Sequence, residues 1–350
     1  MSLDLMFKQA NAAQLAGNWP EAERRYRALT RLKPLWAYHN LGVVYVATGR
    51  FVEAETAFRT ALSVEPTAPA PRYGLGMLLL AGGRYAEGWP LYEARREIPQ
   101  LRTNRPKLAY PEWRGEDLRG KHLLVVTEQG LGDQIQFARF LPELAARGAR
   151  VTFACAPSLT RLFGGLGVEL LPVTPDCILP DADYWTLLMS LPLHMGLTLE
   201  GLSGRPYLSV EAKRPGGGVG VVARGGTSHA NDRFRSLGPE AAEHLLTMGR
   251  NLAPEATGAR DFQETAEIVA GLELVISVDT SVAHLAGALG KPVWILLPAV
   301  ETDWRWLRKR ADSPWYASAR LYRQQAPGKW GAALGQVTTD LGVLGVASSA

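Results

Sequence analysis

One short segment combines residue types that could do chemistry. Gly130-Leu131-Gly132-Asp133 follows an apolar run and precedes a helical pattern. Glycine lets a backbone approach a ligand closely, and the start of a helix attracts anionic groups. Asp133 is then either a general base directed into a cleft or a capping residue of the following helix. The third glycine of a dinucleotide fingerprint is missing, so we do not expect a dinucleotide here.

A second segment, Asp279 to His284, also lies between an apolar run and a helical pattern. Backbone N–H groups of a first helical turn can hold a diphosphate, and Asp279 and His284 could bind sugar or nucleotide groups. The alternative is that Thr280 or Ser281 caps the helix and that His284 is a half-buried histidine whose hydrogen bonds are satisfied.

Three further clusters contain residue types that occur in binding sites. The first is polar and contains His229, Asn231, Asp232, Arg233, Arg235 and Ser236. Its side chains could bind a phosphate, or the segment is equally well a solvated loop. Asp303-Trp304-Arg305-Trp306 favours packing over ligand stacking. Asp181-Ala182-Asp183 resembles a metal-binding Asp-x-Asp motif but precedes its strand, so we interpret it as a turn and expect no metal.

These segments depend on an alternation of strands and helices after residue 120. Apolar runs predict strands at 123–126, 151–154, 168–171, 184–189, 219–223, 274–278 and 293–297. Helical patterns cover 135–147, 159–163, 240–248, 262–270 and 281–289. The order predicts parallel sheets with helices on both faces, in two units joined by a glycine-rich hinge at 215–218. Ligands of such sheets bind beyond the carboxyl ends of the strands, where these segments lie.

The first hundred residues contain a repeat. Gly17, Ala22, Tyr26 and Pro34 recur 32 positions later as Gly49, Ala54, Phe58 and Pro66, and Gly83, Gly88 and Tyr92 belong to a third copy. This spacing is the tetratricopeptide signature, in which paired helices stack into an array. Most of these residues only build the array, and its concave surface is where a protein partner would bind.

Composition excludes several classes. The 350-residue chain has a formal net charge of +4 without a long basic run, so we expect no nucleic-acid or membrane patch. Its two cysteines, Cys155 and Cys177, do not form a disulfide framework, and no apolar run is long enough to span a membrane. The start lacks the pattern of a signal peptide, which favours a cytoplasmic location.

Taken together, the motifs resemble one family. The run from Gly130 to Arg139 resembles the opening motif of bacterial tetratricopeptide glycosyltransferases. The run from Val278 to Gly287, with Gly290-Lys291-Pro292, resembles a signature shared with glycosyltransferase family 9, the heptosyltransferases. Further matches are Tyr85-Ala86-Glu87-Gly88-Trp89, Asp303-Trp304-Arg305-Trp306 and Ser313-Pro314-Trp315-Tyr316. Two segments depart from the family pattern: Ala223–Thr227 replaces a Trp-Ala-Gly-Asn-Pro stretch, and residues 247–260 are short.

The resemblance implies the GT-B fold, two Rossmann-like lobes that perform a metal-independent inverting transfer. It implies that Asp133 is the base and that Asp279 and His284 line the donor site. A distant likeness to O-GlcNAc transferase suggests a protein acceptor. We therefore expect tetratricopeptide repeats at 1–98, a linker at 99–120, an acceptor lobe at 121–212 and a donor lobe at 213–345.

The expected function is transfer of a sugar from a nucleotide-sugar donor to a protein or glycan recruited by the repeats, with no other cofactor. The alternatives are a catalytically degenerate scaffold that binds a protein partner, or a sugar-nucleotide epimerase. The expected catalytic residue is Asp133, and the expected donor-binding residues are Gly132, His229, Arg233, Arg235, Ser236, Asp279, Thr280, Ser281 and His284.

Overall fold

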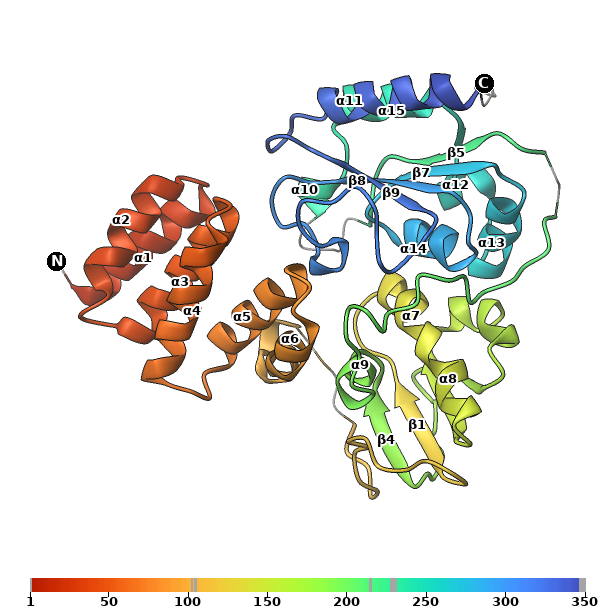
Figure 1. Ribbon diagram of the computed structural model, residues 1–350, viewed down its shortest axis with the longest axis horizontal. Coiled ribbons are helices and arrows are strands. Elements are labelled where there is room, and N and C mark those ends of the chain that lie inside the picture. Colours follow the sequence, from red (N-terminus) through yellow and green to blue (C-terminus); the bar gives the residue numbers. More distant parts are fainter. Residues whose placement is uncertain (1, 102, 104–105, 214–215, 227–231, 346–350) are drawn as a thin grey trace. The chain divides into compact units, whose positions relative to one another are not determined.

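The computed structural model describes residues 2–101, 103, 106–213, 216–226 and 232–345 (Figure 1). The chain forms two compact units. The first contains residues 1–103, 197–199 and 303–308, and the second contains 104–196, 200–302 and 309–350. A helical array is followed by an α/β part with parallel sheets, as the sequence predicts.

The first unit is built from three helix pairs. Its helices are α1 Leu3–Leu15, α2 Trp19–Leu29, α3 Pro34–Ala47, α4 Phe51–Val64, α5 Pro69–Ala81 and α6 Tyr85–Tyr92, followed by the 3-10 turns η1 Glu93–Glu97 and η2 Pro99–Leu101. Gly17, Gly49 and Gly83 lie in the turns between the two helices of each pair, with φ values of 70°, 74° and 79°. These left-handed turns favour glycine, which explains why glycine recurs in the sequence.

The segment 303–308 packs within the first unit despite its distant place in the chain. It contains the 3-10 turn η7, Trp304–Trp306, and the Trp304 side chain is 2% exposed. Its ring centroid lies 5.2 Å from that of Trp89 and 5.7 Å from that of Tyr92, both of α6. The expectation that these tryptophans pack is therefore confirmed for Trp304.

The second unit contains two sheets. In the first, the order is β3-β2-β1-β4 and every pair is parallel. Its strands are β1 His122–Val126, β2 Arg150–Cys155, β3 Glu169–Pro172 and β4 Tyr184–Leu187, close to the predicted ranges. The residues expected to form a plain linker also extend this sheet, because the Trp113 N–H donates to the Trp185 carbonyl oxygen at 2.7 Å.

Two predicted helices of this part were wrong in detail. The helix expected over 135–147 begins earlier and is broken into α7 Leu131–Phe137, η3 Ala138–Phe140 and α8 Leu141–Ala146. Pro142 lacks an N–H and cannot continue a helix from the preceding turn. The segment 159–163 forms the 3-10 turns η4 Pro157–Leu159 and η5 Leu162–Gly165, because Pro157 and two glycines leave too little chain for an α-helix. The turn η6 Leu188–Ser190 and helix α9 Leu191–His194 follow β4.

The second sheet has the order β6-β5-β7-β8-β9, again all parallel. Its strands are β5 Val219–Val222, β6 Arg250–Asn251, β7 Leu274–Val278, β8 Val293–Leu297 and β9 Ala319–Arg323. The helices around it are α10 Asp232–Arg235, α11 Pro239–Leu246, α12 Pro254–Thr257, α13 Phe262–Ala270, α14 Ser281–Ala288 and α15 Gly331–Leu344. The sequence did not predict β9 or α15.

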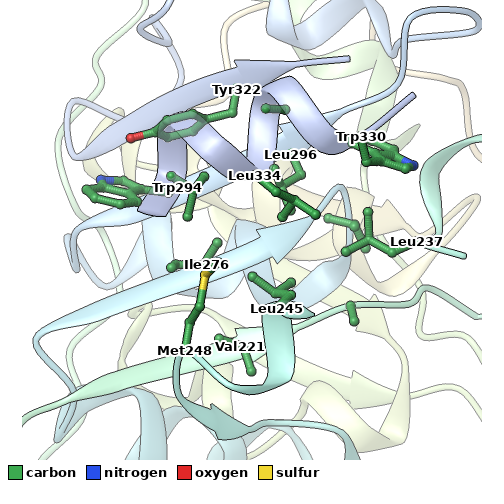
Figure 2. Packing of buried hydrophobic residues seen from close by; sticks show 14 of the residues in the cluster. Val221, Leu237, Leu245, Met248, Ile276, Trp294, Leu296, Tyr322, Trp330 and Leu334 are labelled. Atoms are coloured by element: carbon green, nitrogen blue, oxygen red, sulfur yellow. The ribbon is translucent and has the colours of Figure 1, made fainter. Parts of the chain in front are cut away.

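Helices cover both faces of this sheet. In Figure 1, α11 and α15 lie on one face while α13 and α14 lie on the other. Figure 2 shows the core beneath α11 and α15, where Ile276, Leu296 and Tyr322 from three neighbouring strands meet Leu245 and Leu334. Alternate residues of each strand supply this core, so the residues between them face the helices on the opposite side of the sheet.

Within the described residues, no helix is both long and apolar enough to cross a membrane. Cys155 is buried and Cys177 is partly buried, and both are free thiols.

Candidate functional site

Helices α7 and α14 pack against each other at their first turns, which brings the two predicted segments together. A Cβ atom added to Gly132 would lie 2.9 Å from Cδ2 of His284 and 3.5 Å from the Cα of Ser281. A side chain at this position would therefore have to displace the imidazole or part the two helices. Each helix N-terminus carries a partial positive charge, so their approach creates a region that favours anions.

Asp133 is the third residue of α7. Its Oδ2 atom accepts a hydrogen bond from the Gly130 N–H at 2.9 Å, and the residue is partly exposed. This is the bond that a carboxylate makes when it caps a helix start, as one of the two sequence interpretations expected. The bond also fixes the carboxylate beside Gly132, and the catalytic role of Asp133 stays a prediction.

The link between β7 and α14 holds Asp279 and Thr280. Thr280 occupies the N-cap position of α14, but its hydroxyl lies 3.0 Å from the hydroxyl of Ser277 and makes no capping bond to the described backbone. Thr280 is thus the N-cap residue, as one interpretation of the sequence expected, but its side chain is used for the contact with Ser277 instead of a capping bond. Ser277 is fully buried, and its hydroxyl also donates to the Val278 carbonyl oxygen at 2.6 Å. A buried hydroxyl pair thus fixes the turn that presents Asp279.

His284 is the best-defined residue of this site. It is 7% exposed, its Nδ1 lies 3.0 Å from the Tyr316 hydroxyl, and its Nε2 lies 3.8 Å from Oδ1 of Asp279. Gly287 makes room for the tyrosine ring, since a Cβ atom there would lie 2.4 Å from a ring carbon of Tyr316. The imidazole is therefore held between a hydroxyl and a carboxylate.

The protonation of Tyr316 bears on the imidazole. Burial raises the pKa of Tyr316 well above its usual value, so its hydroxyl keeps its proton near neutral pH. A protonated hydroxyl can donate to Nδ1 of His284, which leaves the proton of a neutral imidazole on Nε2, toward Asp279.

The polar cluster of residues 229–236 contacts the β7–α14 link through Arg235. Arg235 Nη1 donates to the Asp279 carbonyl oxygen at 2.8 Å. Ser236 Oγ accepts from the Gly225 N–H at 2.9 Å and donates to Asp232 Oδ1 at 2.8 Å. Asp232 also accepts from Arg235 Nε at 3.3 Å, so this carboxylate joins the two predicted residues.

Arg233, a predicted residue of this group, points to a different neighbour. The guanidinium of Arg233 lies 4.5 Å from the ring centroid of Phe234, and the residue is exposed. His229 lies outside the described residues.

Arg139, the middle residue of η3, is a structural residue of the site that the sequence did not single out. Its guanidinium lies 4.7 Å from the ring of Tyr207, 5.2 Å from Trp315 and 4.8 Å from Tyr316. Nη1 donates to the Trp315 carbonyl oxygen at 2.7 Å. It therefore fixes Tyr316, the partner of His284. Arg139 and Tyr316 both lie in quoted motifs, whereas Tyr207 gave no local signal.

The described residues contain no cluster of three or more His, Cys, Asp or Glu side chains arranged for a metal ion. Asp183 of the Asp-x-Asp motif accepts from the His122 N–H at 2.8 Å and from Lys121 Nζ at 3.1 Å. These bonds secure the start of β1, in keeping with its interpretation as a turn residue.

Two family models match parts of the chain. A tetratricopeptide repeat model matches residues 7–62 and 39–100, and the model of glycosyltransferase family 9 (heptosyltransferase) matches residues 225–299. The second match spans α10, α14 and the segment Asp279–His284. The chain thus combines a segment that matches tetratricopeptide repeats with a segment that matches glycosyltransferase family 9.

One curated relative is Protein FlbA of Caulobacter vibrioides, which is 27% identical over 370 aligned positions. The alignment covers 87% of this chain and 61% of that protein, so the chain spans about three fifths of its relative's length.

Solved structures show more distant similarity. The iron-containing dodecameric glycosyltransferase TibC from enterotoxigenic E. coli is 16% identical with a TM-score of 0.45, covering 65% of this chain and 78% of that one. The glycosyl transferase family 9 structure from Veillonella parvula is 12% identical with a TM-score of 0.38, covering 67% and 92%. The Thermobaculum terrenum O-GlcNAc transferase is 17% identical with a TM-score of 0.24, covering 86% and 83%.

Proposed function

We propose that this protein transfers a sugar from a nucleotide-sugar donor to a hydroxyl group of a protein or glycan, with inversion at the anomeric carbon and without a metal ion. The observation that carries the proposal is the contact between Gly132 and His284. It places a helix start that bears a carboxylate beside a helix start that bears the polar segment of the family 9 match. Acceptor and donor groups would thus meet at one location.

The donor side consists of the first turn of α14 and the residues tied to it. Negative charge develops on the nucleoside diphosphate as it leaves, and positioned donors stabilise that charge. Ser281 begins α14, and Arg235 is held against the Asp279 carbonyl at 2.8 Å. We assign the diphosphate to this helix start and to Arg235. Thr280 shapes the same turn, and Ser236 holds Asp232, the partner of Arg235.

Asp279 and His284 would contact the sugar or the nucleotide. Arg233 and His229 complete the donor set that we propose.

The acceptor side is assigned to Asp133. In an inverting transfer, the acceptor oxygen attacks the anomeric carbon while the bond from that carbon to the diphosphate oxygen breaks. The acceptor proton passes to the Asp133 carboxylate, and the electron pair of the broken bond leaves with the diphosphate. The hydrogen bond from the Gly130 N–H orients the carboxylate for this step.

The test compares Asp133→Asn with the wild type. The donor is first identified by screening nucleotide sugars for a rise in melting temperature, since a bound donor stabilises the fold. We expect Asp133→Asn to lower turnover about 100-fold or more while donor affinity stays within a few-fold, because a general base contributes about 10²–10⁴ in rate. Asp176→Asn changes an exposed aspartate and is the matched control. Equal turnover of Asp133→Asn and wild type would refute the assigned role.

A second candidate is a degenerate scaffold that binds a protein partner through its repeats. It is favoured by the capping bond of Asp133, which gives the carboxylate a structural role, and by the two-residue length of β6. Donor titration separates the candidates: a scaffold shows no affinity for any nucleotide sugar of the panel, whereas a transferase binds one and slowly releases its nucleotide.

In either case we propose residues 1–98 as the part that recruits a protein, followed by a linker at 99–120. For the transferase, we propose 121–212 as the acceptor lobe and 213–345 as the donor lobe.

A further inference from the structure

A small pocket lies in the first unit, between the second and third helix pairs. Its volume is about 120 Å³, close to the ~150 Å³ cavity size that accepts one benzene ring. It therefore has room for one side chain. The pocket is lined by Phe51 and Glu55 of α4, Leu78 and Leu79 of α5, and also Arg84 and Arg308.

Arg308 is fixed in the wall of this pocket by two contacts. Its guanidinium carbon lies 4.2 Å from the ring centroid of Phe51, a cation–π contact. Its Nη2 atom lies against Gly82, where an added Cβ atom would be only 2.6 Å away. Gly82 follows the last turn of α5, and the partial negative charge of a helix C-terminus favours a cation there.

One end of the guanidinium has hydrogen-bonding capacity left. Nη1 of Arg308 is buried and has no hydrogen-bond partner among the described residues. Buried donors are almost always paired in folded proteins, so an unpaired arginine nitrogen in a pocket wall marks a place for an acceptor. Burial also lowers the pKa of Arg308, opposed by the nearby charge of Glu55, so an added negative charge would offset the cost of desolvation.

The neighbouring charges neutralise one another. Arg84 pairs with Glu55 at 2.7 Å and with Glu87 at 2.7 Å, and Arg59 pairs with Glu55 at 2.8 Å. Two arginines and two glutamates therefore balance, and Arg308 supplies the excess positive charge of this region.

We propose that this pocket binds the carboxylate side chain of a protein partner, an aspartate or glutamate flanked by aliphatic residues. The planar guanidinium matches a carboxylate, and Phe51 and Leu79 contact the methylene groups of the bound side chain. Val52, which lines the pocket and is 79% exposed, offers an apolar rim for the flanking residue. If the chain is the transferase proposed above, on which this part of the inference rests, the partner is its protein acceptor.

The experiment uses the full chain and two fluorescein-labelled heptapeptides. One has the sequence GSLELSG. The other, GSLQLSG, has glutamine in place of the central glutamate and therefore lacks the carboxylate. Fluorescence anisotropy should show at least a 10-fold preference of the wild type for the glutamate peptide. Arg308→Gln should remove the preference, and Arg308→Lys should retain a smaller one because lysine keeps the charge without the planar fork.

Two variants guard against a folding artefact. Val52→Asp alters an exposed position, so the fold should be retained. The added negative charge should lower the affinity for the glutamate peptide by 10-fold or more. Arg24→Gln, at an arginine whose side chain is 67% exposed in the first helix pair, should bind both peptides as the wild type does.

Equal affinity of the wild type for both peptides, no binding at millimolar peptide, or an unchanged preference in Arg308→Gln would overturn the proposal. The titration contains no nucleotide sugar, so it distinguishes a failure of this pocket from a failure of the transferase assignment. A preference for the glutamate peptide without any sugar transfer would support the pocket and refute the transferase. Sugar transfer without that preference would support the transferase and refute the pocket.

Discussion

The contact between Gly132 and His284 can be tested by one added methyl group. In Gly132→Ala, the new Cβ would lie 2.9 Å from Cδ2 of His284, about 0.5 Å short of the 3.4 Å at which ordinary contact begins. The imidazole is buried and held by Tyr316 on its far side, so it has little freedom to move away. Helices α7 and α14 must therefore separate, or the histidine must leave its position.

Two opposing effects set the magnitude. Alanine is a better helix former than glycine by about 1 kcal/mol, which would stabilise α7. Overpacking at a buried contact costs about 1–3 kcal/mol. We expect a net loss of up to about 2 kcal/mol, which corresponds to about 2–4 °C in melting temperature for each kcal/mol in a unit of this size. A misplacement of about 1 Å at a reacting pair costs about 100-fold in rate, so a shift of half that size should lower turnover about 10-fold.

Urea unfolding and nucleotide-release kinetics measure the two consequences. Gly335→Ala is the matched control, because Gly335 lies inside α15 with no atom within 4 Å of its added Cβ. The control should gain stability by about 1 kcal/mol and keep full activity. If Gly132→Ala gained stability as the control does and retained wild-type turnover, the two helix starts would not be in contact, and the site built on them would be refuted.

Three further changes test other parts of the structure. Tyr316→Phe leaves Nδ1 of buried His284 without its hydroxyl, so unfolding in urea should become easier by about 1–3 kcal/mol, whereas a loss below 0.5 kcal/mol would show that this bond is not made. Trp304→Ala empties the aromatic cluster of the first unit and should cost about 3–5 kcal/mol by thermal unfolding; Trp304→Phe should cost less, and equal losses would argue against specific packing. Burial lowers the pKa of His39 to about 4 from a usual 6.5, so the unfolded chain binds the proton more tightly. The contribution of His39 to the free energy of unfolding is then fully present above pH 6.5 and falls by about 2–3 kcal/mol as the pH drops to 4. His39→Phe should reduce this pH dependence. Identical pH profiles of the variant and the wild type would exclude His39 as its cause.

Local patterns determined much of the architecture. The recurring glycines predicted the turns of the helix pairs because only a left-handed conformation fits there. Strands β7 and β8 were predicted with their observed bounds, since buried parallel strands are continuous apolar runs. Strand β9 escaped notice because it contains Arg320 and Arg323, which are typical of an edge strand with solvent on one side.

The sequence also determined where a site could form, because polar segments that follow parallel strands collect at one edge of a sheet. It did not determine which residues would touch. His284 meets Tyr316 across 32 positions, Arg139 meets Trp315 across 176, and Trp304 packs against Trp89. Such pairs depend on how helices and loops pack in three dimensions, and neither periodicity nor propensity within a short window carries that information.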